Sequence, residues 1–436
     1  MANGTVEKLY FSRDTKMYVK LATFFWEIPV LDGFSFSQAS NSTEITINEA
    51  ENSAGESKRA RQLFNDSLAP AEFSFSTYMR PFLSQGSSFH SGVTGADDQA
   101  NHHAVEEVLW ALMATKTHGY TRGTNDFSFD SFTNNTTSLA IDFSDSNSAT
   151  LQEAEFYFVL GGTPNGASNA TITYQLKKAV LNEASIDFEI DGIATIAWSG
   201  NCSEVIDYTG SVIESASEPA HNGTTNDGST IAIGDVWLDT NDDHRLYVMT
   251  NVGNGTEEGT KFINEAVTDS TTFIRNRLTS LTVDGSNTTG LQNSYDVTLT
   301  GGNITISNNI TFITPEELGI VNVPVGHITG TRSVSGSFNC YLTLNTANKT
   351  GSGSGADRSR DLFEDLRALT STVTNSVALT FSIGGSSGIR LEVSMPTCHL
   401  EIPTHSIEDV ISLETNFQAL PSAIDGTNEL TLTYRV

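Results

Sequence analysis

Alternating apolar and polar residues run through most of the chain. The clearest stretches are EITINE from Glu44, EFSFSTYM from Glu72, DFSFDSF from Asp126, YDVTLTGGNITIS from Tyr295 and LTLTYRV from Leu430. Successive side chains of a strand point to opposite faces, so this alternation of Val, Ile, Thr, Phe and Tyr with polar residues predicts half-buried antiparallel strands. The pattern therefore predicts a mainly β protein.

Two segments have the period of a helix instead. Residues 102–115 carry an apolar stripe formed by Val105, Val108, Leu109 and Leu112. Residues 357–370 carry a second stripe, and Asp357 is placed to cap its first turn; the stripe consists of Leu362, Leu366 and Leu369. A weaker third candidate, ESKRARQLFNDS, begins at Glu56. We expect one flanking helix in each half of the chain.

The order of these signals is the same in both halves. YFVLGGTPNGASNATITYQL from Tyr157 and TFSIGGSSGIRLEVSM from Thr380 each contain a strand, a Gly-Gly break and a second strand, as in a hairpin. Each follows a helix segment, and each is followed by a Ser-Ile-acidic triplet, at residues 185–187 and 406–408. This repetition predicts two tandem, similar β-sandwich or barrel domains, at residues 1–200 and 273–436.

Residues 201–272 interrupt the repetition. SASEPAHNGTTNDGST from Ser215 has the composition of a linker, and the following residues, with Asn241-Asp242-Asp243 at a turn, predict a small hairpin with an exposed Trp237. We expect an inserted surface module.

Composition narrows the classes of function. The 436 residues include 23 basic and 52 acidic side chains, a net charge of −29. Tight binding of nucleic acid needs a basic surface, which this balance disfavours. The three cysteines lack CxxC spacing, and neither a signal peptide nor an apolar membrane-spanning run is evident, so we expect a soluble protein made in a cytoplasm.

The residues that could carry chemistry do not form a convincing site. Asp239, Asn241 and Asp243 resemble the start of a calcium loop, but His244 and Thr250 stand where Gly and Glu are needed. The pairs His102 with Glu106 and His103 with Glu107 have helical spacing for a metal, but side-chain pairing in a first turn explains them better. GSGSGAD from Gly351 lacks the Lys-Ser/Thr of a phosphate loop, and no G-x-S-x-G elbow is found. We therefore expect a non-enzyme with no catalytic, cofactor-binding or metal residues, and no cofactor.

The ordered signals resemble those of the tail tube (major tail) proteins of tailed bacteriophages, with the tube domain duplicated. The resemblance rests on the segments Phe34–Glu49 and Asn303–Glu317, the two helix segments, and the Gly-Gly hairpins with their closing strands. It implies a β-sandwich or small barrel with one helix and a long hairpin that contacts the neighbouring ring.

The resemblance also implies a function. A duplicated chain would form stacked trimeric rings with pseudo-sixfold symmetry, a structural virion component made in the bacterial host and acting as a conduit for DNA ejection. Its partners would be further copies of itself, the tape measure and terminator proteins and a sheath where there is one, with double-stranded DNA passing unbound through an acidic lumen and no membrane involved. Two alternatives stay open: a β-sandwich adhesin or carbohydrate-binding surface protein, and a β-sandwich glycosidase with a pair of carboxylates.

Overall fold

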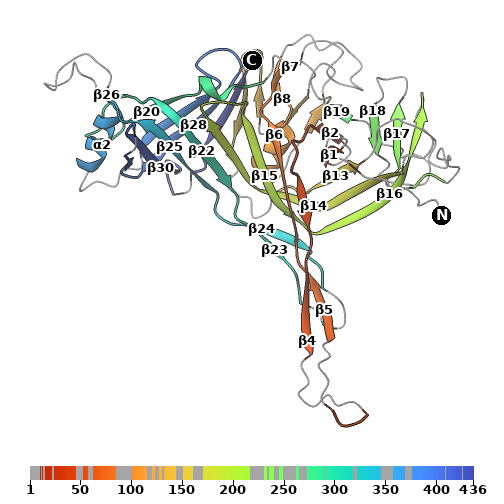
Figure 1. Cartoon of the computed structure of the whole chain (residues 1–436). Coiled ribbons are helices and arrows are strands. Elements are labelled where there is room, and N and C mark those ends of the chain that lie inside the picture. Colours follow the sequence, from red (N-terminus) through yellow and green to blue (C-terminus); the bar gives the residue numbers. More distant parts are fainter. Residues whose placement is uncertain are drawn as a thin grey trace.

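The computed structural model confirms a mainly β protein. It describes residues 10, 12, 15–21, 24–45, 53–56, 62–84, 101–114, 120–122, 127–129, 132–143, 151–160, 170–216, 230–232, 235–239, 245–248, 262–264, 273–288, 290–316, 318, 322–344, 357–368, 376–407, 409–424 and 426–436. Within these ranges a 23-stranded sheet dominates, accompanied by two α-helices, of which Figure 1 labels α2.

The elements up to residue 264 include most of the first half and the inserted segment. Their bounds are β1 Thr15–Leu21, β2 Phe24–Ile28, β3 Ser35–Ser37, β4 Ser40–Ile45, β5 Gln62–Leu68, β6 Ala71–Tyr78, β7 Pro81–Ser84, β8 Asn101–Ala104, α1 Glu107–Ala114, β9 Tyr120–Arg122, β10 Phe127–Phe129, β11 Phe132–Asn134, β12 Leu139–Asp142, β13 Ala154–Leu160, β14 Ala170–Glu189, β15 Thr195–Cys202, β16 Glu204–Ser215, β17 Val236–Asp239, β18 Arg245–Val248 and β19 Phe262–Asn264.

The elements from residue 276 onward form the second half. Their bounds are a 3-10 turn at Asn276–Leu278, β20 Ser280–Asp284, β21 Tyr295–Asp296, β22 Leu299–Ser307, β23 Ile310–Ile313, β24 Gly326–Thr329, β25 Ser333–Tyr341, β26 Asp357–Arg358, α2 Ser359–Ala368, β27 Val377–Ile383, β28 Arg390–Leu400, β29 Thr404–Ser406, β30 Ser412–Ala419 and β31 Thr431–Arg435.

Strand pairing follows the same plan in both halves. In the first half β1 pairs with β13, β13 with β14, β14 with β15, and β15 with β6. In the second half β20 pairs with β27, β27 with β28, β28 with β30, and β30 with β25. The β6–β15 and β25–β30 ladders each contain eight residue pairs.

An irregularity at the same place fixes the correspondence residue by residue. The β13–β14 ladder shifts register between Ala154 and Phe156, and the β27–β28 ladder shifts between Val377 and Leu379. Phe156 therefore corresponds to Leu379, and Phe158 to Phe381, which makes Gly-Gly follow both strands directly. The residues after Leu160 lie outside the described residues until Ala170.

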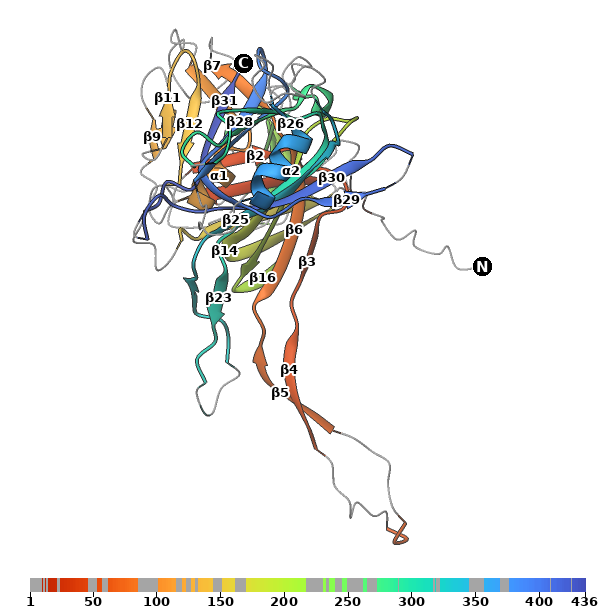
Figure 2. The ribbon, with the colours of Figure 1, turned by 90° about the vertical axis from the view of Figure 1, so that its left-hand side faces the viewer.

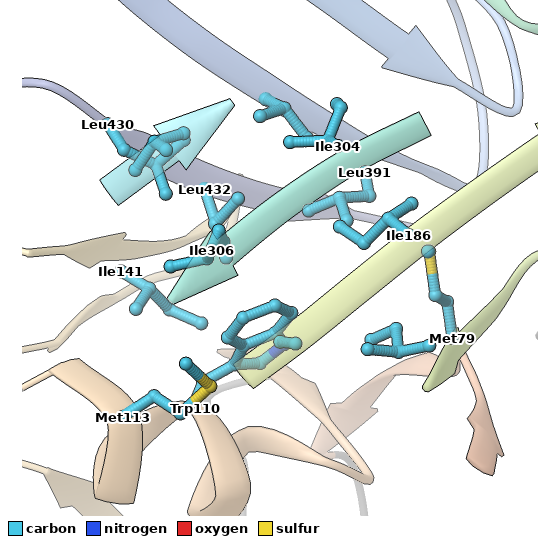
Figure 3. Packing of buried hydrophobic residues seen from close by; sticks show 14 of the residues in the cluster. Met79, Trp110, Met113, Ile141, Ile186, Ile304, Ile306, Leu391, Leu430 and Leu432 are labelled. Carbon is cyan, nitrogen blue, oxygen red and sulfur yellow. The ribbon is translucent and has the colours of Figure 1, made fainter. Parts of the chain in front are cut away.

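The two halves join in one sheet and one core. Strand β14 pairs with β22 over seven residues, from Glu183 opposite Ser307 to Glu189 opposite Gly301. On the buried side of this junction Ile186 lies near Ile304, close to Trp110 and Met113 of α1 (Figure 3). Burial of these side chains from water provides the main stabilisation, and the continuous core couples the halves.

Helix α1 is shorter than its sequence pattern predicted. Residues 101–104 form β8, which pairs with β7, and the helix begins only at Glu107. The whole helix is buried, so its apolar residues pack all round and the predicted stripe is part of a fully covered surface.

Helix α2 lies where it was predicted but begins later. Asp357 and Arg358 form β26 against β21, so Asp357 does not cap the helix. Instead, the Asp361 side chain accepts a hydrogen bond from the backbone N–H of Arg358 at 3.0 Å. Leu362 and Leu366 are buried, as the stripe predicted.

The third helix candidate, from Glu56, is wrong. Residues 62–68 form β5, which pairs with β4 in an extended hairpin. Cross-strand pairing overrides the helix propensity of this charged stretch. Two hairpins, β4–β5 and β23–β24, extend from the body of the molecule (Figure 1). They make contact where Leu68 and Asn322 share a backbone hydrogen bond of 2.8 Å.

Two smaller expectations are corrected. Trp237 is buried at 4% exposure in β17, which pairs with β16. The Ser-Ile-acidic triplets do not correspond. Ser185 pairs with Ala197, whereas Ser406 pairs with Ser412, and these pairings make Ser406 the counterpart of Asp187, two residues after Ser185. A three-residue match between polar strands arises easily by chance.

Candidate functional site

The candidate site is one face of an antiparallel run of eight strands. The run follows the order β3, β6, β15, β14, β22, β25, β30, β29, with residues 183–189 as the contribution of β14. Four of its strands come from each half of the chain. Figure 1 shows β6, β15 and β14 crossing the body beside β22, β25 and β30.

Alternation separates the two faces of this run. In β6 the buried residues are Ala71, Phe73, Phe75 and Thr77, and in β15 they are Ile196, Trp198, Gly200 and Cys202. The residues between them, such as Ser74 and Ser199, lie on the opposite face and are paired across the strands. The second half repeats this arrangement, with Phe338 on the core side and Ser337 on the polar side. We call the surface of the eight-strand run that faces away from the core the polar face.

The polar face has hydroxyls, amides and carboxylates, and its eight segments supply no lysine or arginine, although the chain has 23. Five acidic residues occur in these segments, and none of them is buried: Glu72, Glu183, Asp187, Glu189 and Glu414. The one histidine is His405, in the edge strand β29. The polar face is therefore weakly acidic and mostly neutral.

Hydrogen bonds between neighbouring strands connect side chains of the polar face. The hydroxyls of Ser35 and Ser74 lie 2.9 Å apart on neighbouring strands. The Asn303 side-chain oxygen accepts hydrogen bonds from the backbone N–H and the hydroxyl of Ser337, at 2.9 and 3.1 Å. These contacts pair polar groups of the polar face with one another, which leaves few strong hydrogen-bond donors for an anionic ligand.

Two shallow hollows lie at corresponding places on the polar face. One is lined by Ser35, Ser74 and Ser199, and the other by their counterparts Asn303, Ser337 and Asn416. Both are open to solvent, and neither is lined by a lysine or arginine. Their corresponding positions follow from the repeated strand pairing, and the second hollow is also lined by His399 and Glu401.

The carboxylates of the polar face lie close enough to influence one another. Partial burial raises the pKa of Asp187, and the negative charge of Glu189 raises it further. Repulsion between like charges is the expected result where acidic side chains share a surface that no cation neutralises.

Of the two predicted His-Glu pairs, the structure forms only the pair of His103 and Glu107, in the core of the first half. His103 Nδ1 lies 3.0 Å from Glu107 Oε2, and both side chains are buried. His102 Nδ1 lies 3.1 Å from the backbone oxygen of Asn135, and burial lowers its pKa. Among the described residues no group of three His, Cys, Asp or Glu side chains is arranged to hold a metal. The pair of His103 and Glu107 joins β8 to the start of α1.

Glu106 lies apart from both histidines in a buried cluster. Its carboxylate accepts a 2.7 Å hydrogen bond from the Tyr434 hydroxyl and longer bonds from the backbone N–H of Arg80. The Tyr434 oxygen in turn accepts a 2.8 Å bond from the Trp110 indole N–H. Burial raises the pKa of Glu106 to about 7, against the opposing effect of these hydrogen bonds. The cluster fastens α1 of the first half to β31 of the second.

The remaining sequence candidates supply no site within the described ranges. Cys202, Cys340 and Cys398 are buried free thiols, and burial raises their pKa values to about 12, 11 and 12. Asp239 ends β17, but Asn241, Asp243, His244, Thr250 and Gly351 lie outside the described residues. Neither described helix is long and apolar enough to cross a membrane.

The polar face was not singled out from the sequence. Its signal was visible in strands such as SFS, AEFSFSTY and SVSGSFNCY, where Ser occupies the alternate positions and basic residues are absent. Recognising it required knowing which strands are neighbours, since the run joins segments from Ser35 to Ala419.

Comparison with known proteins gives the decisive observation. No family model matches the chain. The chain is 27% identical over 430 residues to tail tube protein pb6 of Escherichia phage T5, covering 97% of this chain and 75% of that protein. The chain is a relative of a phage tail tube protein. The similarity spans both halves and the segment between them, so it includes every strand of the polar face.

Proposed function

We propose that this protein is the structural subunit of a phage tail tube. The observation that carries the proposal is the eight-strand run with a polar face free of lysine and arginine, found in a chain related to a tail tube protein along nearly all its length. A sheet of this kind can serve as the wall of a channel. The protein acts by assembling, without catalysis, and belongs to the tail of the virion.

The repeated plan supports a duplicated tube domain. Strand β16 pairs with the first part of β14 as β31 pairs with the first part of β28, so β16 closes the first repeat as β31 closes the second. We therefore extend the first domain from the expected residue 200 to Ser215. The inserted module then begins after Ser215, and the second domain keeps its expected start near residue 273.

Three copies of a duplicated chain supply six equivalent domains to a ring. Rings that close head to tail through unlike surfaces bury the free edges of their sheets, and stacked rings form a tube. The two hairpins that extend from the body are suited to bridging one ring to the next. Their exposed apolar side chains include Leu63, Phe64, Ile313, Val325 and Ile328.

The polar face suits the lumen of such a tube. Phosphate groups bind proteins mainly through lysine and arginine, whose contacts release counterions. A wall of hydroxyls, amides and five carboxylates per chain offers no such contact and weakly repels the DNA backbone, so DNA slides through during ejection. The acidity of the lumen then depends on few of the 52 acidic residues of the chain.

Size-exclusion chromatography with light scattering, followed by negative-stain imaging, tests the proposal. We expect hollow rings or tubes whose smallest closed unit has three times the mass of the 47.0 kDa chain. A monodisperse monomer at concentrations up to the millimolar range contradicts it and favours the adhesin alternative.

A further inference from the structure

The eight-strand run ends in two strands that have a neighbour on one side only. Within the described residues β3 pairs with β6 alone, and β29 pairs with β30 alone. Both are short and solvent-exposed, with Phe36 the one half-buried residue of the six. A free edge presents N–H and C=O groups that can pair with another strand. In Figure 2 the β29–β30 hairpin extends away from the body, which leaves β29 accessible.

Inside the chain, the equivalent edges of the two halves are paired with each other. The junction between the halves is the antiparallel pairing of β14 with β22, in which Ser185 lies opposite Thr305 and Asp187 opposite Asn303. The common plan makes β29 the counterpart of the end of β14, and β3 the counterpart of β22. The same type of strand is thus paired at the middle of the run and free at its two ends.

The registers of the flanking strands fix which residues correspond. Ser185 pairs with Ala197 of β15, and Thr404 pairs with Glu414 of β30, the counterpart of Ala197. Likewise Asn303 pairs with Ser337 of β25, and Ser35 pairs with Ser74 of β6, the counterpart of Ser337. Thr404, His405 and Ser406 therefore stand for Ser185, Ile186 and Asp187, and Ser35, Phe36 and Ser37 for Asn303, Ile304 and Thr305.

An apolar side chain beside β29 has no cover in a single chain. At the internal junction Phe188 is 1% exposed and lies against Gly302 of β22. Its counterpart one residue beyond β29 is Ile407, which is 79% exposed. Val410 and Ile411 in the same turn are also exposed, so an apolar patch adjoins the free edge.

From this correspondence, and resting on the proposed ring, we propose that β29 of one copy adds to β3 of a second copy as an antiparallel strand. Thr404 lies opposite Ser37, His405 opposite Phe36, and Ser406 opposite Ser35 of the second copy. Ile407 packs on Phe34 of the second copy, where Phe188 packs on Gly302 within the chain.

This pairing is head to tail, because the two edges belong to different halves of the chain. Repeated around a ring it leaves no free edge on the run, and three copies of eight strands close into one continuous wall. The polar faces of all copies then line the same side of that wall.

Engineered disulfides test the register. Residues directly opposite on antiparallel strands have Cβ atoms about 4.5–5.5 Å apart, whereas diagonal neighbours lie about 7–8 Å apart. We expect Ser37→Cys with Thr404→Cys to link neighbouring copies into covalent trimers under mild oxidation, seen on non-reducing gels. The register-shifted pair Ser35→Cys with Thr404→Cys serves as the mismatched control and gives little product. The buried native thiols contribute no background.

Two controls separate this inference from the proposed function. The pair Ser185→Cys with Thr305→Cys should form a disulfide inside one chain. This positive control shows that oxidation links directly opposite residues at the β14–β22 junction. Rings that form while the Ser37–Thr404 pair stays unlinked, or while the shifted pair links better, overturn the register and leave the proposed function standing. Failure of the unmodified protein to form rings overturns both.

A substitution at the apolar patch gives an independent readout. Ile407→Asp places a charge at the inferred boundary between copies, and we expect it to shift the protein from rings to monomers while the circular dichroism spectrum is unchanged. Ile190→Asp is the control, because Ile190 is also exposed, at 49% against 79% for Ile407, and it lies in the corresponding turn beside a junction that is paired inside the chain. Equal assembly of the two variants contradicts the inference.

Discussion

At the residue scale, the buried cluster around Glu106 has the clearest physical consequence. Its carboxyl group is fully buried, and its pKa is raised to about 7 by desolvation. A carboxyl group whose pKa is higher in the folded protein than in the unfolded chain favours folding at low pH. The contribution is lost as the pH rises from the ordinary value near 4.5 through about 7.

We predict that Glu106→Gln removes this pH dependence. A shift from 4.5 to about 7 corresponds to about 3 kcal/mol. The variant should therefore be more stable relative to the natural protein at pH 8 than at pH 4.5: the difference between their free energies of unfolding, variant minus natural, should be about 2–3 kcal/mol higher at pH 8. Denaturant titrations of both proteins at the two pH values measure this difference, and a difference that does not change with pH contradicts the account.

The partner of Glu106 gives a second prediction. Tyr434→Phe removes the hydroxyl that links the carboxylate to the Trp110 indole N–H, and it leaves that buried donor without its acceptor. We expect a loss of about 1–3 kcal/mol in the free energy of unfolding. The matched substitution Tyr341→Phe, at a more exposed tyrosine, should cost less than half as much; equal losses would falsify the role of the cluster.

At the element scale, strands were predictable and helix limits were not. The alternation in Ala71–Tyr78 and Thr431–Arg435 predicted β6 and β31 because those strands bury one face only. His102 and His103 were placed in a helix because side-chain spacing alone does not reveal the pairing of β8 with β7. The β5 strand was missed for the same reason, since its polar residues are exposed and its partner β4 determines its conformation.

The two hairpins supply the prediction at this scale. In unassembled protein the backbone amides of β4, β5, β23 and β24 should exchange quickly, because few buried side chains support them, and they should become protected in stacked rings. Hydrogen exchange followed by mass spectrometry measures this, with the β6–β15 ladder as the internal reference that is protected in both states. Equal exchange of the hairpins before and after assembly contradicts their role between rings.

At the scale of the whole molecule, the sequence indicated a mainly β protein with two similar domains and a resemblance to tail tube proteins. It did not indicate the surface on which the proposed function depends. The resemblance implied an acidic lumen, and this stays a prediction. The polar face that we propose for the lumen consists mainly of Ser, Thr and Asn with five carboxylates, and it combines residues as distant as Ser35 and Gln418. Such a surface becomes visible only when strand order is known, because strand order is set by long-range pairing.

A prediction about charge follows from the polar face. Lysine at the corresponding positions Ser74 and Ser337 would line the lumen with six added cations per ring of three copies. Tubes of this variant should retain double-stranded DNA at low salt and release it as salt increases, whereas tubes of the natural protein and of a Ser74→Gln, Ser337→Gln control should not. Identical DNA retention by tubes of the lysine variant, the glutamine control and the natural protein would contradict a location of the polar face in the lumen.

Imaging of assembled tubes by electron cryomicroscopy tests the central claim most directly. The account predicts rings of three copies with six similar domains, whose continuous inner wall is made of the eight-strand runs with Ser74, Ser185 and Ser337 facing the bore. Tubes in which the polar face lies outside or is buried between rings, or a protein that stays monomeric, contradict it.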